Sequence, residues 1–196
     1  MGRPRLVKEI VLIGGPNGAG KTTVARVLLR EFLNKNVFLN ADEIAREIAP
    51  ENPEAAAFAA GRELIERMRG LVQQGRSFAL ETTCSGRAYL HFLGQCKSDG
   101  WRITLLYFWL PSPEFSMARV TKRVREGGHS VPREAIFRRY RLSVWNMLHL
   151  YLPLAETAAI YDNSQRRRVL IAVKESGFPM RILDQRLWSE VEKSSI

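Results

Sequence analysis

Short runs of apolar residues alternate along the chain with longer segments whose apolar positions recur every three or four residues. The first run, 9–13, leads into a glycine-rich loop, and the segment after that loop carries a helical stripe. Continuous apolar runs of this length are typical of strands buried on both faces, and the wider spacing is typical of amphipathic helices. We expect strands over 9–13, 37–40, 77–80, 101–110, 159–162 and 169–173. We expect helices over 21–34, 42–48, 53–74, 86–97, 112–126, 132–149 and 182–193.

Strands that alternate with helices of this length predict βαβ units and a parallel sheet covered on both faces. The expected fold is a P-loop NTPase of the kinase-like type. It would have three layers, a central mostly parallel five-stranded sheet flanked by helices, and a helical lid over about 112–149. The 196 residues contain no repeat or linker, so we expect a single domain over 1–196. In such sheets ligands bind at the carboxyl ends of the strands.

Composition adds a preference for anionic partners. Lys and Arg number 30 against 20 Asp and Glu, which gives a net charge of +10. Such a balance favours nucleic acid, nucleotides, phosphorylated metabolites or an acidic protein. No apolar run approaches the roughly 20 residues of a membrane span. The two cysteines, Cys84 and Cys96, fit a reducing compartment. We therefore expect a cytoplasmic protein with no membrane partner.

The strongest chemical signal is the stretch "GPNGAGKT", residues 15–22, which matches G-x-x-x-x-G-K-[ST] in full. It follows an expected strand and opens an expected helix, which is the context that a phosphate-binding loop requires. Glycines let successive N–H groups point at phosphate oxygens, and the helix N-terminus adds a partial positive charge. Lys21 would reach the β- and γ-phosphates, and Thr22 would offer its hydroxyl to Mg²⁺. The predicted ATP-binding residues are Gly15, Pro16, Asn17, Gly18, Ala19, Gly20, Lys21, Thr22 and Thr23.

Two carboxylates follow expected strands and should stand near this loop. Asp42 comes after strand 37–40, and Glu81 ends strand 77–80. A kinase needs a carboxylate there to accept the proton of an attacking hydroxyl. Asp42 has an equally weighted structural alternative, as the N-cap of the helix after it. The structural alternative for Glu81 is an ion pair with an arginine. Strand 101–110 ends without an acid, so a second magnesium anchor is not predicted there.

Basic residues crowd the two helices expected after strand 101–110. Between Arg119 and Arg141 there are eight Lys or Arg and two acids. Arg119 and Arg123 are four positions apart and share one helix face. A helix–Gly-Gly–helix unit at this place is where P-loop kinases carry a lid, whose arginines stabilise charge during phosphoryl transfer. The alternative is solvated surface charge.

The blocks "GGPNGAGKTT", "LNADEIA", "ALETT", "ARVTKRVREGGHSVPREAIFRRYR" and "YDNS", in this order, resemble the zeta-toxin-like family of P-loop kinases. The resemblance spans about residues 10–173. It implies an α/β kinase fold that uses ATP and Mg²⁺. In that family ATP phosphorylates the 3′-hydroxyl of the amino sugar in UDP-N-acetylglucosamine.

Carried over by motif, the resemblance implies a role for several residues. Lys21 and Thr22 would hold ATP and Mg²⁺, and Asp42 would be the general base and, with Thr22, a residue of the metal site. Glu81 and Thr83 match the E-x-T that contacts the sugar nucleotide. Arg119 or Arg123 would be the first lid arginine. The second lid arginine of the family lies shortly before a proline, where this chain has His129 before Pro132. The other lid candidates are Arg133, Arg138 and Arg139.

The leading hypothesis is thus an ATP-dependent kinase with a small hydroxyl-bearing acceptor, such as UDP-N-acetylglucosamine. The high net charge keeps a second hypothesis open, a nucleic-acid-binding ATPase or polynucleotide kinase. It is less favoured because the basic residues gather beside the phosphate loop and no aromatic strand surface for stacking bases is evident. A third hypothesis is a toxin-type role with an acidic antitoxin protein as partner.

Overall fold

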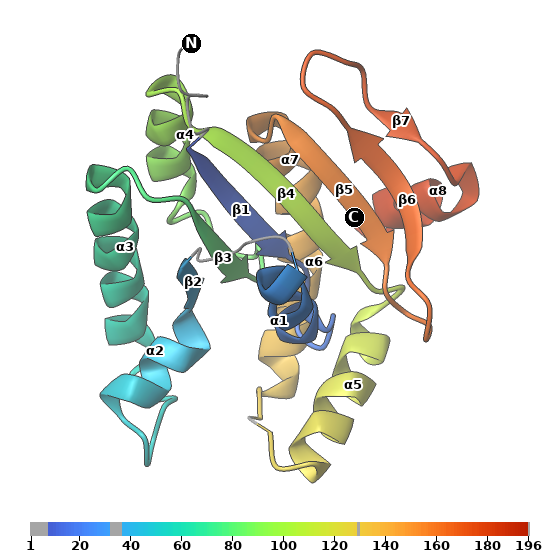
Figure 1. Cartoon of the computed structure of the whole chain (residues 1–196). Coiled ribbons are helices and arrows are strands. Elements are labelled where there is room, and N and C mark those ends of the chain that lie inside the picture. Colours follow the sequence, from blue (N-terminus) through green and yellow to red (C-terminus); the bar gives the residue numbers. More distant parts are fainter. Residues whose placement is uncertain (1–7, 32–36, 129, 196) are drawn as a thin grey trace.

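The computed structural model describes residues 8–31, 37–128 and 130–195, and its strands form one sheet in the order β2-β3-β1-β4-β5-β6-β7. In the view of Figure 1, α1 lies in front of this sheet and α6 lies behind it. The strands are β1 (Glu9–Gly14), β2 (Val37–Asn40), β3 (Phe78–Thr82), β4 (Arg102–Trp109), β5 (Thr157–Asp162), β6 (Val169–Lys174) and β7 (Arg181–Ile182). The helices are α1 (Lys21–Glu31), α2 (Ala41–Ile48), α3 (Ala57–Gln73), α4 (Leu90–Ser98), α5 (Pro113–Arg125), α6 (Arg133–Asn146), the π-helix η1 (Met147–Tyr151), α7 (Leu152–Leu154) and α8 (Gln185–Lys193).

The first five strands in the sheet order are parallel, which confirms the expected mostly parallel sheet and kinase-like α/β fold. The sheet has two more strands than the expected five: β6, which matches the expected strand 169–173, and β7, which was not expected, and both extend the sheet in antiparallel pairing. Only residues 163–168 connect β5 to β6. A parallel pair needs a crossover of a dozen or more residues, so this short connection permits only a hairpin.

The central position of β1 determines where the chemistry can lie. Gly14 is in register with Thr82 of β3 on one side and with Tyr107 of β4 on the other. The carboxyl ends of three neighbouring strands therefore meet at one edge of the sheet. Residues 10–14 are all buried, so β1 holds the loop that follows it against the core.

The two helices expected to form a lid differ in their packing. Ile136, Tyr140 and Val144 of α6 are buried and lie four positions apart on one face of the helix. The Tyr140 hydroxyl donates to the carbonyl of Leu110 at 2.7 Å, and the hydroxyls of Tyr107 and Ser143 are 2.8 Å apart. The second half of α6 is thus part of the core. Among the described residues, no helix has both the length and the apolar character needed to cross a membrane.

Candidate active site

The phosphate loop, residues 15–20, lies between the end of β4 and helix α5. Gly15 has φ +145°, and a Cβ there would lie 2.4 Å from the carbonyl oxygen of Phe108. Gly18 has φ +76°, and a Cβ there would lie 2.9 Å from the carbonyl oxygen of Ser116. Because both neighbours are backbone atoms, neither could move aside without displacing an element. The loop therefore requires glycine at both positions.

Lys21 begins α1 with only 7% of its side chain exposed. Its Nζ donates to the carbonyl oxygen of Pro16 at 3.0 Å and lies 4.0 Å from Oε1 of Glu81. Burial lowers the pKa of Lys21 because it disfavours the charged form, while the carboxylate of Glu81 acts in the opposite direction. The ammonium group is thus folded back under the loop, in reach of phosphate oxygens that the loop would bind.

Glu81 is the centre of a hydrogen-bonded cluster. The Thr22 hydroxyl lies 3.1 and 2.9 Å from its two carboxylate oxygens, and Nδ2 of Asn40 donates to Oε2 at 2.9 Å. Burial raises the pKa of Glu81, and the charge of Lys21 and the Thr22 hydrogen bond oppose that rise. The structural alternative, an ion pair with an arginine, is not seen among the described residues, where the cation beside Glu81 is Lys21.

In this cluster the carboxylate beside the Thr22 hydroxyl is that of Glu81. Strand β4 does end without an acid, but β1 has a second neighbour, β3, and that strand carries Glu81. A P-loop hydroxyl together with a carboxylate on an adjacent strand is the usual protein contribution to a Mg²⁺ site. Among the described residues there is no group of three or more His, Cys, Asp or Glu that could hold a metal. Thr22 and Glu81 therefore fit Mg²⁺ that draws its other ligands from phosphates and water.

Asp42 lies in the first turn of α2 with an exposed side chain. The N-cap of α2 is Asn40, whose side chain accepts the backbone N–H of Asp42 at 2.8 Å. The alternative that Asp42 is itself the N-cap is therefore wrong. Its charge still acts on the cluster: burial is the main cause of the raised pKa of Glu81, and Asp42 raises it further. Burial lowers the pKa of Lys21, and the charges of Glu81 and Asp42 are among the effects that oppose this fall.

Thr83 follows β3 and is half-buried. Its hydroxyl lies 2.7 Å from that of Ser85, and between them Cys84 has φ +55°. The hydroxyl pair therefore sits at the carboxyl edge of the sheet, two residues beyond Glu81.

The predicted lid arginines separate into two groups. Arg119 donates to the carbonyl oxygen of Ser164 at 2.7 Å and stacks over Phe115. Arg123 lies near Lys21: burial is the main cause of the lowered pKa of Lys21, and the charge of Arg123 lowers it further. Both are on the face of α5 towards the phosphate loop.

The remaining lid candidates lie on α6 or before it. Arg133 stacks over Phe137, and in the part of the chain that the structure describes Arg138 and Arg139 make no hydrogen bond or ion pair. His129 is outside the described residues. The structure therefore brings Arg119 and Arg123 to the loop and leaves Arg138 and Arg139 without a described contact there.

Sequence reasoning gave no role to Asn40 or to the residues after β5. Nδ2 of Asn163 donates to the carbonyl oxygen of Ala19 in the phosphate loop at 2.7 Å. The buried carboxylate of Asp162 accepts from the backbone and the hydroxyl of Ser164. Polar residues directly after an apolar strand are the signal that could have identified this segment, because the carboxyl end of β5 lies at the same edge as the loop.

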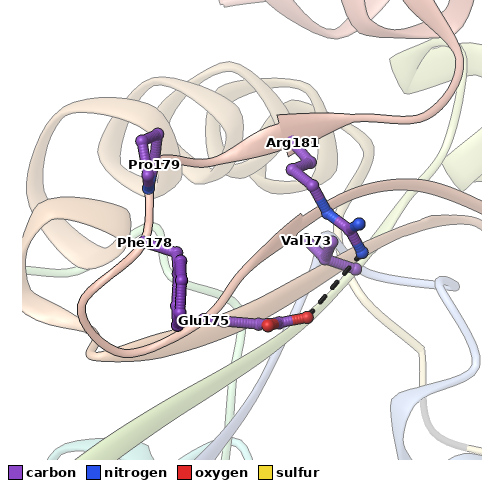
Figure 2. Close-up of a pocket in the computed structure, with 5 residues that line it drawn as sticks. All are labelled: Val173, Glu175, Phe178, Pro179 and Arg181. Carbon is purple, nitrogen blue, oxygen red and sulfur yellow. Dashed lines mark ion pairs between the residues drawn. The ribbon is translucent and has the colours of Figure 1, made fainter.

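Two surface hollows lie outside this cluster. One, of about 280 Å³, lies between α5 and the start of α6 and has Arg125 and Arg133 among mainly apolar residues. Figure 2 shows the other, of about 220 Å³, where Glu175 and Arg181 approach to 3.7 Å beside Phe178. Because Lys174 pairs with Ala158 at the beginning of β5, this second hollow is at the opposite edge of the sheet from the phosphate loop.

Comparison with known proteins agrees with this architecture. A family model described as AAA domain matches residues 10–142. A protein of Haemophilus influenzae, described as uncharacterized, is 32% identical over 128 residues, which cover 64% of this chain and 88% of that protein.

Two solved structures are similar in fold. The complex of AvrRxo1-ORF1 and AvrRxo1-ORF2 with ATP matches with a TM-score of 0.71 and 16% identity, over 97% of this chain and 64% of that one. This chain therefore spans less than two thirds of that protein. The PezAT chromosomal toxin–antitoxin system of Streptococcus pneumoniae matches with a TM-score of 0.65 and 19% identity, over 98% of this chain and 87% of that one.

These likenesses support a P-loop kinase-like fold, which implies nucleotide binding. They support the resemblance to zeta toxins at the level of the fold and do not assign this chain to that group. The match over residues 10–142 covers more than half of the chain, and the chain therefore belongs to the AAA domain family.

Proposed function

We propose that this chain is an ATP-dependent phosphotransferase that moves the γ-phosphate to a hydroxyl of a small molecule. The observation that carries the proposal is the cluster at the carboxyl edge of the sheet. There Glu81 accepts a hydrogen bond from Thr22 and lies 4.0 Å from Nζ of Lys21 beside the phosphate loop, and the charge of Asp42 acts on Glu81.

Each group has a place in the transfer. Backbone N–H groups of the loop would bind the phosphates, and Lys21 would stabilise negative charge on the β- and γ-phosphates. Thr22 and Glu81 would hold Mg²⁺, which would supply positive charge to offset that of the phosphates. Asp42 would accept the proton of the acceptor hydroxyl, and Arg119 and Arg123 would stabilise the charge on the transferred group.

The acceptor we infer is a nucleotide sugar such as UDP-N-acetylglucosamine. Its support is the sequence resemblance to zeta toxins together with the fold similarity to the PezAT system. Thr83 and Ser85, next to Glu81, would provide hydroxyls for such a polar acceptor. The net charge of +10 further supports an acidic protein, of the antitoxin kind, as a partner.

The test is a transfer screen with γ-labelled ATP and Mg²⁺. UDP-N-acetylglucosamine, other nucleotide sugars and hydroxyl-bearing metabolites serve as acceptors, and Lys21→Met serves as the inactive control. We expect label in one acceptor class that depends on Lys21. A protein that binds ATP but labels no hydroxyl compound in the screen would contradict the proposal.

A second candidate is phosphorylation of a nucleic-acid end. It is favoured by three exposed arginines, Arg166, Arg167 and Arg168, in the turn that follows Asn163 beside the phosphate loop. An oligonucleotide with a free 5′-hydroxyl belongs in the same screen, with binding measured at two salt concentrations. Phosphate contacts predict a steep loss of affinity at the higher salt. Absence of both label and retained oligonucleotide would exclude this candidate.

A further inference from the structure

The loop after β3, residues 83–86, holds a strained backbone conformation; we name it the acceptor loop. Cys84 has φ +55°, and among the described residues it is the one non-glycine residue with positive φ. This conformation is unfavourable for a residue with a Cβ, so it persists only where surrounding contacts impose it. The contacts around the acceptor loop therefore indicate what fixes its shape.

Two buried side chains from a distant part of the chain hold the acceptor loop. Nδ2 of Asn146 donates to the carbonyl oxygen of Cys84 at 2.8 Å, and the Tyr151 hydroxyl donates to that of Gly86 at 2.8 Å. Asn146 and Tyr151 both have 0% relative exposure. Within the loop, the Cys84 N–H donates to the Thr82 hydroxyl at 3.0 Å. The Asn146 bond is buried and costly to break because the freed Cys84 carbonyl would lack a partner, whereas the Tyr151 bond to Gly86 is partly buried.

The π-helix η1 explains how one helix supplies both contacts. Asn146 is the last residue of α6, and Tyr151 ends η1, in which the N–H of Leu152 bonds to the carbonyl of Met147. In a regular α-helix, residues five apart would point about 140° away from each other. The wider turn of a π-helix reduces that angle, and such turns are rare and often lie at functional sites.

The acceptor loop also packs directly under the phosphate loop. A Cβ on Gly14, the last residue of β1, would lie 2.8 Å from Sγ of Cys84. Burial raises the pKa of the Cys84 thiol to about 12, and the charge of Lys21 is among the effects that oppose this rise. The thiol is therefore an inert packing group between the two loops, and a shift of Cys84 would displace the phosphate loop and Thr83 relative to each other.

We propose that Asn146 and Tyr151 are positioning residues for phosphoryl transfer, which fix the acceptor loop at a set distance from the phosphate loop. The proposal rests on the proposed phosphotransferase function. Helix α6 begins at Arg133 beside the hollow at α5 and ends at Asn146 on the acceptor loop. Helix α6 thus connects the arginine-rich end of the site to the acceptor loop.

Cys84 itself reports whether the acceptor loop is held. The experiment measures the rate at which Ellman's reagent labels Cys84 in the full chain, with Cys96 replaced by Ala so that one thiol remains. Tyr151→Phe removes one hydrogen bond and keeps the ring. Tyr140→Phe is the control, because it removes another tyrosine hydrogen bond, from α6 to the carbonyl of Leu110, which is more deeply buried than the Tyr151 bond. We expect labelling to rise about fivefold or more in Tyr151→Phe and Asn146→Ala, and less than twofold in Tyr140→Phe.

The second readout separates positioning from general stability. A fluorescent ATP analogue should bind each variant within twofold of the parent, and the KM for UDP-N-acetylglucosamine should rise about fivefold while the KM for ATP stays constant. Equal labelling of Tyr151→Phe and Tyr140→Phe would overturn the proposal, and so would a KM for ATP that rises in parallel with the KM for the sugar. If Asn146→Ala does not fold, Tyr151→Phe decides alone. The thiol-labelling experiment needs no acceptor, so it tests whether the acceptor loop is held even where the proposed function fails. Failure of the proposed function would appear instead as an absence of label in the transfer screen.

Discussion

Asn40 makes two contacts that define the candidate site, and Asn40→Ala would remove both. Its Oδ1 accepts the N–H of Asp42 and caps α2, and its Nδ2 donates to the carboxylate of Glu81. The residue is buried, with 6% exposed, so water cannot easily replace the lost partners. The change should therefore lower the stability of the fold and displace Asp42 and Glu81 together.

The magnitude follows from the two contacts. Loss of an N-cap costs about 1 kcal/mol, and loss of a hydrogen bond to a charged group costs about 1.5–3 kcal/mol. The sum is about 3 kcal/mol. For a chain of this length each kcal/mol corresponds to about 2–4 °C in melting temperature, which predicts a drop of about 10 °C.

Asp184→Ala is the matched control for Asn40→Ala. Asp184 caps α8 by accepting the N–H of Leu187 at 2.9 Å, and α8 packs on β6, far along the sheet order from the phosphate loop. Thermal melts should show a loss of about 3 °C for this variant with unchanged transfer. If Asn40→Ala costs no more than Asp184→Ala, or leaves transfer unchanged, the hydrogen bond to Glu81 does not organise the site.

Three further variants test individual parts of the site. Gly15→Ala places a Cβ 2.4 Å from the carbonyl oxygen of Phe108, so the variant should no longer bind a fluorescent ATP analogue. Retained affinity would show that the loop can adopt another conformation. Thr22→Val should abolish the gain in ATP affinity on adding Mg²⁺, measured by titration calorimetry, whereas an unchanged gain would place the metal elsewhere. Burial raises the pKa of Glu81 above its ordinary 4.5, so the ligand-free fold loses stability as pH rises through that raised value. Glu81→Gln should therefore flatten the fall of melting temperature above about pH 4.5, and an unchanged pH profile would contradict this electrostatic role.

The sequence predicted the parallel sheet and the phosphate loop because both depend on local signals. An apolar strand, a glycine-rich loop and a helix follow each other directly in the chain, and the glycine requirement at residues 15 and 18 is confirmed by their close backbone neighbours.

The partners of Glu81 could not be read in the same way. They depend on which strands are neighbours, and the order β2-β3-β1-β4 does not follow the order along the chain. Thr22, Asn40 and Glu81 are far apart in sequence and meet only because β3 lies between β2 and β1. The N-cap was misplaced by two residues, since Asn40 and Asp42 are both good capping residues and only the backbone geometry distinguishes them.

The central claim is that Asp42 accepts the proton of an acceptor hydroxyl, and it is tested most directly by comparing Asp42→Asn with Glu43→Gln. The two acids are adjacent in the first turn of α2, so each variant removes one negative charge from the same place. In the labelled-ATP assay, we predict that Asp42→Asn lowers kcat for transfer about 100-fold or more while ATP binding stays within twofold. Glu43→Gln should keep most of the transfer activity. Full transfer by Asp42→Asn, or an equal loss in Glu43→Gln, would contradict the claim.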